Sequence, residues 1–223
     1  MPNLEPRAAV QSARTRVMLV DDHAIVRSGF RRLLDQYPGI QVIVESANAD
    51  SAYRDFLEYM PDVLVLDISM PGVGGLEIMR RILAREPQAR IIVFSMHDVA
   101  AMATRAMRVG ARGYVSKSNN PEVLAQAVIE VAAGRQFLSP DIAHAVAISM
   151  LSGLDDPLEL LSAREFEVFQ QVVAGRSAAE IARTLDLSGK TISNYHTTIK
   201  QKLNVTTDVE LVRIALRYNL LKE

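Results

Sequence analysis

Short apolar runs that alternate with helical patterns fill the first 135 residues of the chain. The runs cover residues 16–21, 40–46, 63–66, 91–95 and 111–117. Between and after them, apolar residues recur at spacings of three and four, which is the period of an amphipathic helix. The helices expected there cover residues 24–36, 49–59, 76–86, 98–110 and 121–134. Strands that alternate with helices in this way predict a five-stranded parallel doubly wound sheet, flavodoxin-like in architecture.

The run at residues 63–66 is the most informative of the five strands. It reads Val-Leu-Val-Leu without a polar break and ends on one carboxylate, Asp67. An unbroken apolar run predicts a strand that is buried on both faces of a parallel sheet. Because burying a charge is costly, we expect Asp67 at the end of the strand, in the loop layer. Open α/β sheets bind their ligands at this edge.

The pattern changes in the last third of the chain, where four capped helices replace the strands. Ser162, Ser177, Ser188 and Thr207 each precede a segment with apolar residues at helical spacing. The first two begin Ser-x-x-Glu capping boxes, in which each side chain binds an unpaired backbone donor. Only two residues, 186–187, separate the second helix from the third, and such a short turn is typical of a helix-turn-helix. We therefore predict an all-α four-helix helix-turn-helix domain.

These patterns divide the chain into four parts. We expect a loose tail over residues 1–15, an α/β domain over 16–135, a linker with a short helix over 136–158, and a helical domain over 159–223. Within the linker, Ser139-Pro140-Asp141 resembles a helix start, and Gly153 with Asp155-Asp156-Pro157 predicts a break.

Composition excludes several classes of protein. The chain has 223 residues and no cysteine, which excludes disulfides, thiolate catalysis and cysteine zinc sites. No apolar run approaches the roughly 20 residues of a membrane span, and residues 1–15 lack the apolar core of a signal peptide. We expect a cytoplasmic protein without a membrane partner.

Positive charge is concentrated on one predicted helix. The formal net charge of the whole chain is −1, so a nucleic-acid partner needs a local basic patch. Residues 158–223 hold nine Lys and Arg against eight Asp and Glu, a net charge of only +1. Residues 188–203 hold three Lys and no acidic residue, which gives +3. A helix with lysines and polar donors on its free face suits the major groove of DNA.

Polar residues follow four of the five predicted strands. Asp21 and Asp22 end the first, Asp67 the third, Ser95 the fourth and Lys117 the fifth. The carboxyl ends of parallel strands share one edge, so these side chains are expected together. Carboxylates suit Mg²⁺, an aspartate can form an aspartyl phosphate, and lysine and serine donate to phosphoryl oxygens. We interpret Asp67 as a covalent acceptor of a phosphoryl group.

The segments that carry these residues are VMLVDDH, VLVLDISMPG, VFSMHD and GYVSK. In them the chain resembles the receiver domain of bacterial two-component response regulators. The resemblance implies that Asp21, Asp22, Asp67 and the backbone carbonyl of Ser69 hold Mg²⁺, and that a sensor histidine kinase phosphorylates Asp67. It also implies that Lys117 contacts the phosphoryl group and that Ser95 and Tyr114 form a switch pair. Ordinary packing in the sheet explains Tyr114 equally well.

The helical region carries LSAREFEVFQQVVAG, SAAEIARTLDLS and KTISNYHTTIKQKLNV. It resembles the LuxR-type helix-turn-helix of the NarL/FixJ response regulators. The resemblance implies double-stranded promoter DNA as a partner, a homodimer in the active state, RNA polymerase as a further partner, and a resting receiver that masks the recognition helix. The expected DNA-binding residues are Lys190, Thr191, Ser193, Asn194, His196, Thr197, Lys200 and Lys202.

Two positions depart from that family pattern. Ser193 stands where lysine is frequent and Tyr195 where histidine is frequent, so charged base readers are few. We expect Asn194 and Thr197 to reach bases, and the three lysines to contact mostly phosphates.

Two other functions compete with this one. A phosphatase of the haloacid dehalogenase type also forms an aspartyl phosphate, but it needs a second carboxylate two residues later, where this chain has Ser69. DNA binding that is independent of phosphate is the second alternative. The segment Ser188-Gly-Lys-Thr191 resembles the end of a phosphate-binding P-loop, but Thr184 replaces the required glycine and no strand precedes it. We expect a regulator that is not an enzyme.

Overall fold

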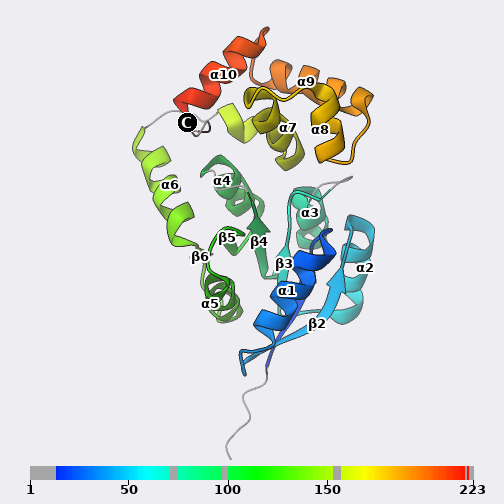
Figure 1. The fold of residues 1–223 in the computed structure, drawn as a ribbon. Helices are drawn as coiled ribbons and strands as arrows, with labels where there is room; N and C mark the ends of the chain where they lie inside the picture. The colour runs from blue at the N-terminus through cyan, green and yellow to red at the C-terminus, as the bar shows by residue number, and fades with distance from the viewer. Residues whose placement is uncertain (1–13, 71–74, 97–99, 153–156, 219, 221–223) are drawn as a thin grey trace, which may run out of the picture.

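The first domain is a parallel sheet between two layers of helices (Figure 1). The computed structural model describes residues 14–70, 75–96, 100–152, 157–218 and 220. All strand pairs are parallel, in the order β2-β1-β3-β4-β5-β6. The strands are β1 (Thr15–Val20), β2 (Ile40–Ser46), β3 (Val63–Leu66), β4 (Ile91–Ser95), β5 (Gly113–Ser116) and β6 (Phe137–Leu138).

Five helices cover the two faces of this sheet. Helices α1 and α5 pack on one face, and α2, α3 and α4 pack on the other (Figure 1). Their bounds are α1 (Ala24–Leu34), α2 (Ala49–Tyr59), α3 (Gly75–Arg85), α4 (Ala100–Val109) and α5 (Pro121–Ala132). The predicted loop at residues 71–74 lies outside the described residues, as do residues 97–99 and most of the predicted tail.

The unbroken apolar strands follow from burial on both faces. Along β1, Val17 and Leu19 join the core beneath α1 and α5, whereas Met18 and Val20 join the core beneath α2, α3 and α4. All four side chains are at most 3% exposed. Successive side chains of a strand point to opposite faces, so a covered sheet requires apolar residues at every position.

The five predicted strands are present, and a short sixth strand extends the sheet. In β6, Phe137 pairs with Gly113 and Leu138 with Tyr114. The backbone N–H of Ser139 donates to the carbonyl of Tyr114 at 3.0 Å. Two residues are too few to show a strand period, so this strand depends on its neighbour β5 and not on a local pattern.

The linker packs against the α/β domain. It contains α6 (Pro140–Ser152) and a 3₁₀ helix, η1 (Pro157–Leu160), which both contact α4. Ile142 of α6 and Leu158 of η1 are fully buried, and the side chain of Arg105 on α4 donates to the carbonyl of Leu161. The predicted break at residues 153–156 lies outside the described residues.

Within the described part of the C-terminal domain there are four α-helices, as predicted. They are α7 (Ala163–Val173), α8 (Ala178–Thr184), α9 (Gly189–Lys202) and α10 (Asp208–Arg217). The capping boxes predicted at Ser162 and Ser177 are confirmed, and Thr207 forms a third one at the start of α10. Ser188 caps α9 by accepting from the backbone N–H of Thr191 at 3.1 Å. No helix of the described ranges is long and apolar enough to cross a membrane.

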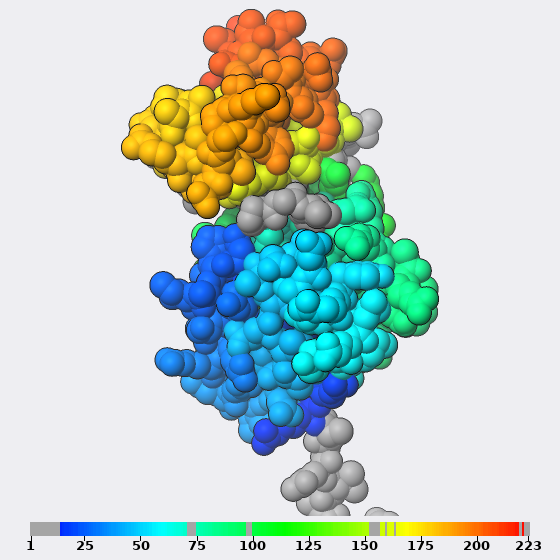
Figure 2. Space-filling model, turned by 90° about the vertical axis from the view of Figure 1, so that its right-hand side faces the viewer, coloured from blue at the N-terminus to red at the C-terminus, as the bar shows by residue number. Residues whose placement is uncertain are grey.

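The helical domain forms a separate lobe at one end of the α/β domain (Figure 2). Helices α7 and α8 lie on the side of the receiver, and α9 lies on the opposite side (Figure 1). Lys190, Ser193, Asn194 and Thr197 on α9 are all exposed. The receiver therefore does not cover the recognition helix in this arrangement, which differs from what the family resemblance implies.

The cap of α10 gives a prediction for acid stability. Glu210 accepts the backbone N–H groups of Thr206 and Thr207 at 2.9 and 2.8 Å, and these bonds lower its pKa to about 2. A lowered pKa in the folded state contributes stability above the unfolded pKa of about 4.5, and this contribution is lost as the pH falls toward 2.

We therefore expect Glu210→Gln to be less stable than the wild type near neutral pH, with the difference shrinking below about pH 4.5. Glutamine can still accept at the cap, so the variant removes mainly the charge. Urea unfolding of both proteins across this pH range measures the difference. A stability difference between the two proteins that does not change with pH would contradict the lowered pKa of Glu210.

Candidate phosphorylation site and nucleic-acid interface

The polar residues predicted at strand ends lie together at the carboxyl edge of the sheet. Asp21 directly follows β1, Asp67 follows β3, Ser95 ends β4 and Lys117 follows β5. These four strands are neighbours in the sheet order. Parallel strands with one carboxyl edge explain how residues that are 96 positions apart, such as Asp21 and Lys117, come into contact.

One ammonium group bridges two buried carboxylates at this edge. Nζ of Lys117 lies 2.5 Å from Oδ2 of Asp67 and 2.7 Å from Oδ2 of Asp21. The three side chains are 6, 2 and 7% exposed, respectively. Burial raises the pKa of the Asp67 carboxyl, and Lys117 offsets this only in part. Burial also opposes the charge of Lys117, but Asp67 and Asp21 outweigh it and raise the pKa of the ammonium.

Backbone amides hold the second oxygen of each bridged carboxylate. The N–H of Ser69 donates to Oδ1 of Asp67 at 2.8 Å, and the N–H of His23 donates to Oδ1 of Asp21 at 2.7 Å. Both carboxylates are thus fixed by one amide and one ammonium. Such fixed oxygens need little rearrangement to bind a cation or to attack an electrophile.

The acidic cluster fits a divalent cation. Ligand atoms of Asp21, Asp22, His23 and Asp67 all lie within 4.8 Å of one another. Oδ1 of Asp22 is buried and accepts no hydrogen bond from the described residues, and Nδ1 of His23 lies 3.0 Å from it. Carboxylate oxygens are the ligands that Mg²⁺ takes in proteins. A buried carboxylate oxygen without a hydrogen-bond donor fits the role of a metal ligand.

The two proposed switch residues are both fully buried. Ser95 and Tyr114 have no exposed surface, and the Tyr114 ring belongs to the core beneath α2, α3 and α4. The ring is therefore already inside the fold. Packing accounts for this position, and a role as a switch stays a prediction.

Sequence reasoning missed two charged residues near the site. Nη1 of Arg27 donates to the carbonyl of Asp21 at 2.5 Å, and its Nε lies 3.3 Å from Glu45. Glu167, on α7, is half-buried and pairs with Arg164. Burial raises the pKa of its carboxyl, Arg164 lowers it in part, and the charges of Asp67 and Asp22 make smaller contributions that raise it. Helical spacing places Arg27 on the first helix but does not reveal its contact. No local signal could reveal Glu167, because its position depends on how the two domains pack.

Gly75 lies against the backbone of Asp67 and Ile68. A Cβ atom added there would lie 2.5 Å from both the carbonyl oxygen of Asp67 and Cα of Ile68. We expect Gly75→Ala to displace this backbone, to destabilise the fold by about 1–3 kcal/mol, and to reduce labelling of Asp67 by a phosphodonor. Urea unfolding and intact-mass measurement test both effects.

Gly29→Ala is the matched control for this substitution. Gly29 lies in α1 and a Cβ there meets no atom within 4 Å. Alanine is the better helix former, so the control is expected to stabilise the protein by roughly 0.5–1 kcal/mol. Normal labelling of Gly75→Ala would contradict the proposed backbone constraint.

The predicted DNA-binding residues on α9 fall into two groups. Lys190, Ser193, Asn194 and Thr197 are exposed, and Thr191 is half-buried beside the Ser188 cap. The remaining three have acidic partners in the same domain: His196 and Lys200 with Asp208, and Lys202 with Glu165. Lys202 lies 2.6 Å from Glu165, whose side chain is 8% exposed and also caps α7. Lys202, whose side chain is 36% exposed, thus has an acidic partner in its own domain, and its phosphate contact stays a prediction.

Two protein-family models match the chain in series. Residues 17–129 match the response regulator receiver domain, and residues 159–215 match the luxR family of bacterial regulatory proteins. The chain is 35% identical to response regulator UvrY of Escherichia coli K12 over 206 residues, which cover 92% of this chain and 94% of the relative. It is 34% identical to response regulator GacA of Pseudomonas aeruginosa over 207 residues, which cover 92% and 97%.

Solved structures agree with this match. A LuxR-family response regulator from Aurantimonas has 46% identity and a TM-score of 0.61, over 62% of this chain and 99% of that one. RcsB of Salmonella enterica, bound to promoter rprA in the presence of phosphomimetic BeF₃⁻, has 26% identity and a TM-score of 0.61, over 90% and 98%. The chain is therefore a two-component response regulator of the NarL/FixJ family, with a receiver domain followed by a LuxR-type helix-turn-helix domain.

Proposed function

We propose that Asp67 is the phosphorylation site, and that its phosphorylation by a sensor histidine kinase controls DNA binding by α9. The observation that carries this proposal is the ammonium of Lys117 between the buried carboxylates of Asp67 and Asp21. One oxygen of Asp67 attacks phosphorus, the bond from phosphorus to the histidine nitrogen breaks, and the ring nitrogen keeps the electron pair. The product is an aspartyl phosphate and a neutral histidine.

Mg²⁺ is the cation that this site would hold. Its ligands would be Asp21, Asp22, Asp67 and the backbone carbonyl of Ser69, and the bound ion would neutralise the charge that builds up on the phosphoryl oxygens. Lys117 already lies beside Asp67, so its ammonium can donate to a phosphoryl oxygen on Asp67 without moving to another part of the site. Ser95, at the end of the adjacent strand β4, would donate its hydroxyl, with Tyr114 behind it.

Charge repulsion offers a way to couple the two domains. Glu167 on α7 pairs with Arg164, and the charges of Asp67 and Asp22 also raise the pKa of its carboxyl. Arg105 on α4 donates to the carbonyl of Leu161, just before α7. A phosphoryl group adds a charge of about −1.5 to −2. This charge would repel Glu167 and weaken the packing of α7 on the receiver. A freed helical domain could then pair with a second copy through exposed residues of α10, such as Leu216.

Double-stranded promoter DNA is the proposed target of the output domain. The exposed face of α9 presents Lys190, Asn194 and Thr197, which combine one cation with side chains that can reach base edges. A homodimer would read two half-sites about one helical turn apart. Its site of action would be the bacterial cytoplasm, where it could also contact RNA polymerase. The RcsB relative bound to a promoter with a phosphomimetic supports this proposal.

A phosphatase fits the site less well. The position two residues after Asp67 is Ser69, whose side chain is a buried hydroxyl and not a carboxylate. A hydroxyl cannot serve as the acid and base that such a reaction requires near neutral pH. The stable aspartyl phosphate of a regulator is the better fit.

Selection of DNA from a random pool tests the proposed output. The full-length chain, treated with a small-molecule phosphodonor and Mg²⁺, is expected to recover a common sequence with two related half-sites. Asp67→Asn under the same conditions serves as the control and should recover that sequence less efficiently. Recovery of no common sequence by either protein would reject the DNA-binding proposal.

A further inference from the structure

We infer that Asp208 competes with DNA phosphates for Lys200 of the recognition helix and so weakens binding to DNA. This inference rests on the proposed DNA binding by α9. It concerns a residue outside the recognition helix, in the first turn of α10. Asp208 itself makes no helix cap, because the capping bonds of α10 come from Thr207 and Glu210.

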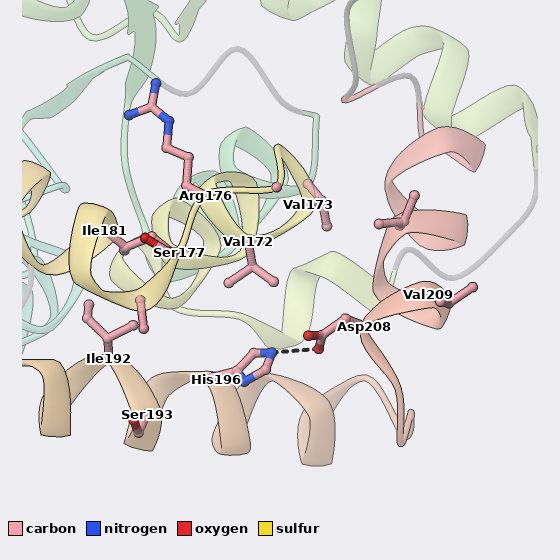
Figure 3. A pocket seen from close by; sticks show the side chains of 13 residues that line it. Val172, Val173, Arg176, Ser177, Ile181, Ile192, Ser193, His196, Asp208 and Val209 are labelled. Carbon is pink, nitrogen blue, oxygen red and sulfur yellow. Dashed lines mark hydrogen bonds and ion pairs between the residues drawn. The ribbon is translucent and has the colours of Figure 1, made fainter.

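One oxygen of Asp208 contacts both His196 and Lys200. Nε2 of His196 lies 2.7 Å from Oδ1 of Asp208, and Nζ of Lys200 lies 2.9 Å from the same oxygen. His196 and Lys200 are four residues apart on α9, so they project from the same face of the helix. Figure 3 shows the His196 ring directed at Asp208 along the flank of α9. The carboxylate therefore lies beside the predicted DNA-binding surface.

The three contacting side chains are accessible to a competing anion. The side chain of Asp208 is 58% exposed, and those of His196 and Lys200 are 30% and 24% exposed. His196 and Asp208 also line a hollow of about 600 Å³ between α7, α8, α9 and α10 (Figure 3). An ion pair between solvent-exposed side chains is weak, so a phosphate of DNA can replace the carboxylate of Asp208.

The other lysines of α9 show why Asp208 matters most. Lys202 pairs with Glu165, whose side chain is only 8% exposed, whereas the partner of Lys200 is 58% exposed. Lys190 is exposed at the start of the helix. Lys200 is therefore the cation whose availability to DNA can be set by a nearby exposed carboxylate. The negative charge of Asp208 reduces the electrostatic attraction between α9 and the phosphates of DNA, whatever the DNA sequence.

This competition weakens binding to DNA of any sequence. A phosphate gains Lys200 only after the ion pair with Asp208 is broken. The cost of breaking this pair reduces the affinity of α9 for selected and for random DNA.

Asp208→Asn tests the inference in the full-length chain. The amide removes the negative charge and leaves the cap of Thr207 in place. Binding to a short random duplex is measured by fluorescence anisotropy between about 50 and 200 mM salt. We expect tighter binding at low salt and a salt slope steeper by about 0.9, since one freed cation can neutralise one further phosphate. Over that salt range this corresponds to about 3.5-fold more loss of affinity than in the wild type.

Asp186→Asn is the matched control, because it makes the same charge change elsewhere in the domain. Asp186 is exposed in the turn before α9, and asparagine tolerates its positive φ of 51°. In a second control, Lys200→Ala combined with Asp208→Asn should lose the gain.

Several results would overturn the inference while the proposed function stands. They are equal effects of Asp208→Asn and Asp186→Asn, no steeper slope in Asp208→Asn, or a gain that persists without Lys200. Failure of the wild type to bind any DNA would instead reject the proposed function, and the inference with it.

Discussion

Asp67→Asn is expected to abolish acyl-phosphate labelling of the chain. The amide oxygen of asparagine is a poor nucleophile, so the variant lacks the proposed acceptor. The wild type, incubated with acetyl phosphate and Mg²⁺, should gain the mass of one phosphoryl group. The adduct should be labile to hydroxylamine, as an acyl phosphate is. The variant should gain nothing under the same conditions.

The fold of this variant should survive, because Lys117 keeps its second carboxylate partner, Asp21, at 2.7 Å. Asp50→Asn is the matched control, since Asp50 is exposed on α2 and should leave labelling unchanged. Asp22→Asn should still be labelled, but only at a higher Mg²⁺ concentration, because it removes one proposed ligand. A labile adduct of normal yield in Asp67→Asn would disprove the site.

Asn194→Ala is expected to change sequence preference without weakening binding to random DNA. The Asn194 side chain is exposed on the outward face of α9, and an asparagine can bind an adenine edge with two hydrogen bonds. Loss of such a pair costs about 1–3 kcal/mol, which is roughly 5- to 150-fold in affinity for the preferred sequence. Competition of selected and random duplexes for the variant measures this ratio.

Lys190→Ala provides the contrast. Lys190 is exposed in the first turn of α9 and offers a charge but no base-specific geometry. Its removal should weaken binding to all DNA alike and reduce the salt slope by about 0.9. Equal losses on selected and random DNA in Asn194→Ala would contradict its assignment as a base reader.

The sequence predicted the receiver sheet well because each element has a local signal. The unbroken run before Asp67 required burial on both faces, and the strand ends placed Asp21, Asp67 and Lys117 at one edge. The helical domain was predictable for the same reason, since Ser162 and Ser177 signal their own helix starts.

The contacts that the sequence did not predict are all tertiary. The strand β6 exists because β5 offers it a partner, and two residues carry no period. Lys202 was expected at a phosphate, and its pairing with Glu165, which is 37 positions earlier, was not predicted. The arrangement of the two domains, with α7 toward the receiver and α9 away from it, leaves no trace in spacing or composition. In a sequence, apolar residues that are buried between two domains cannot be told from apolar residues of a domain core, so they do not reveal the interface.

The most direct test of the account is the effect of phosphorylation on DNA affinity. The full-length wild type and Asp67→Asn are titrated with the selected duplex, with and without acetyl phosphate in the presence of Mg²⁺. The account predicts tighter binding on phosphodonor treatment for the wild type and no response for Asp67→Asn. Equal affinity of the wild type in both conditions, or an equal response of the variant, would contradict control of the helical domain through Asp67.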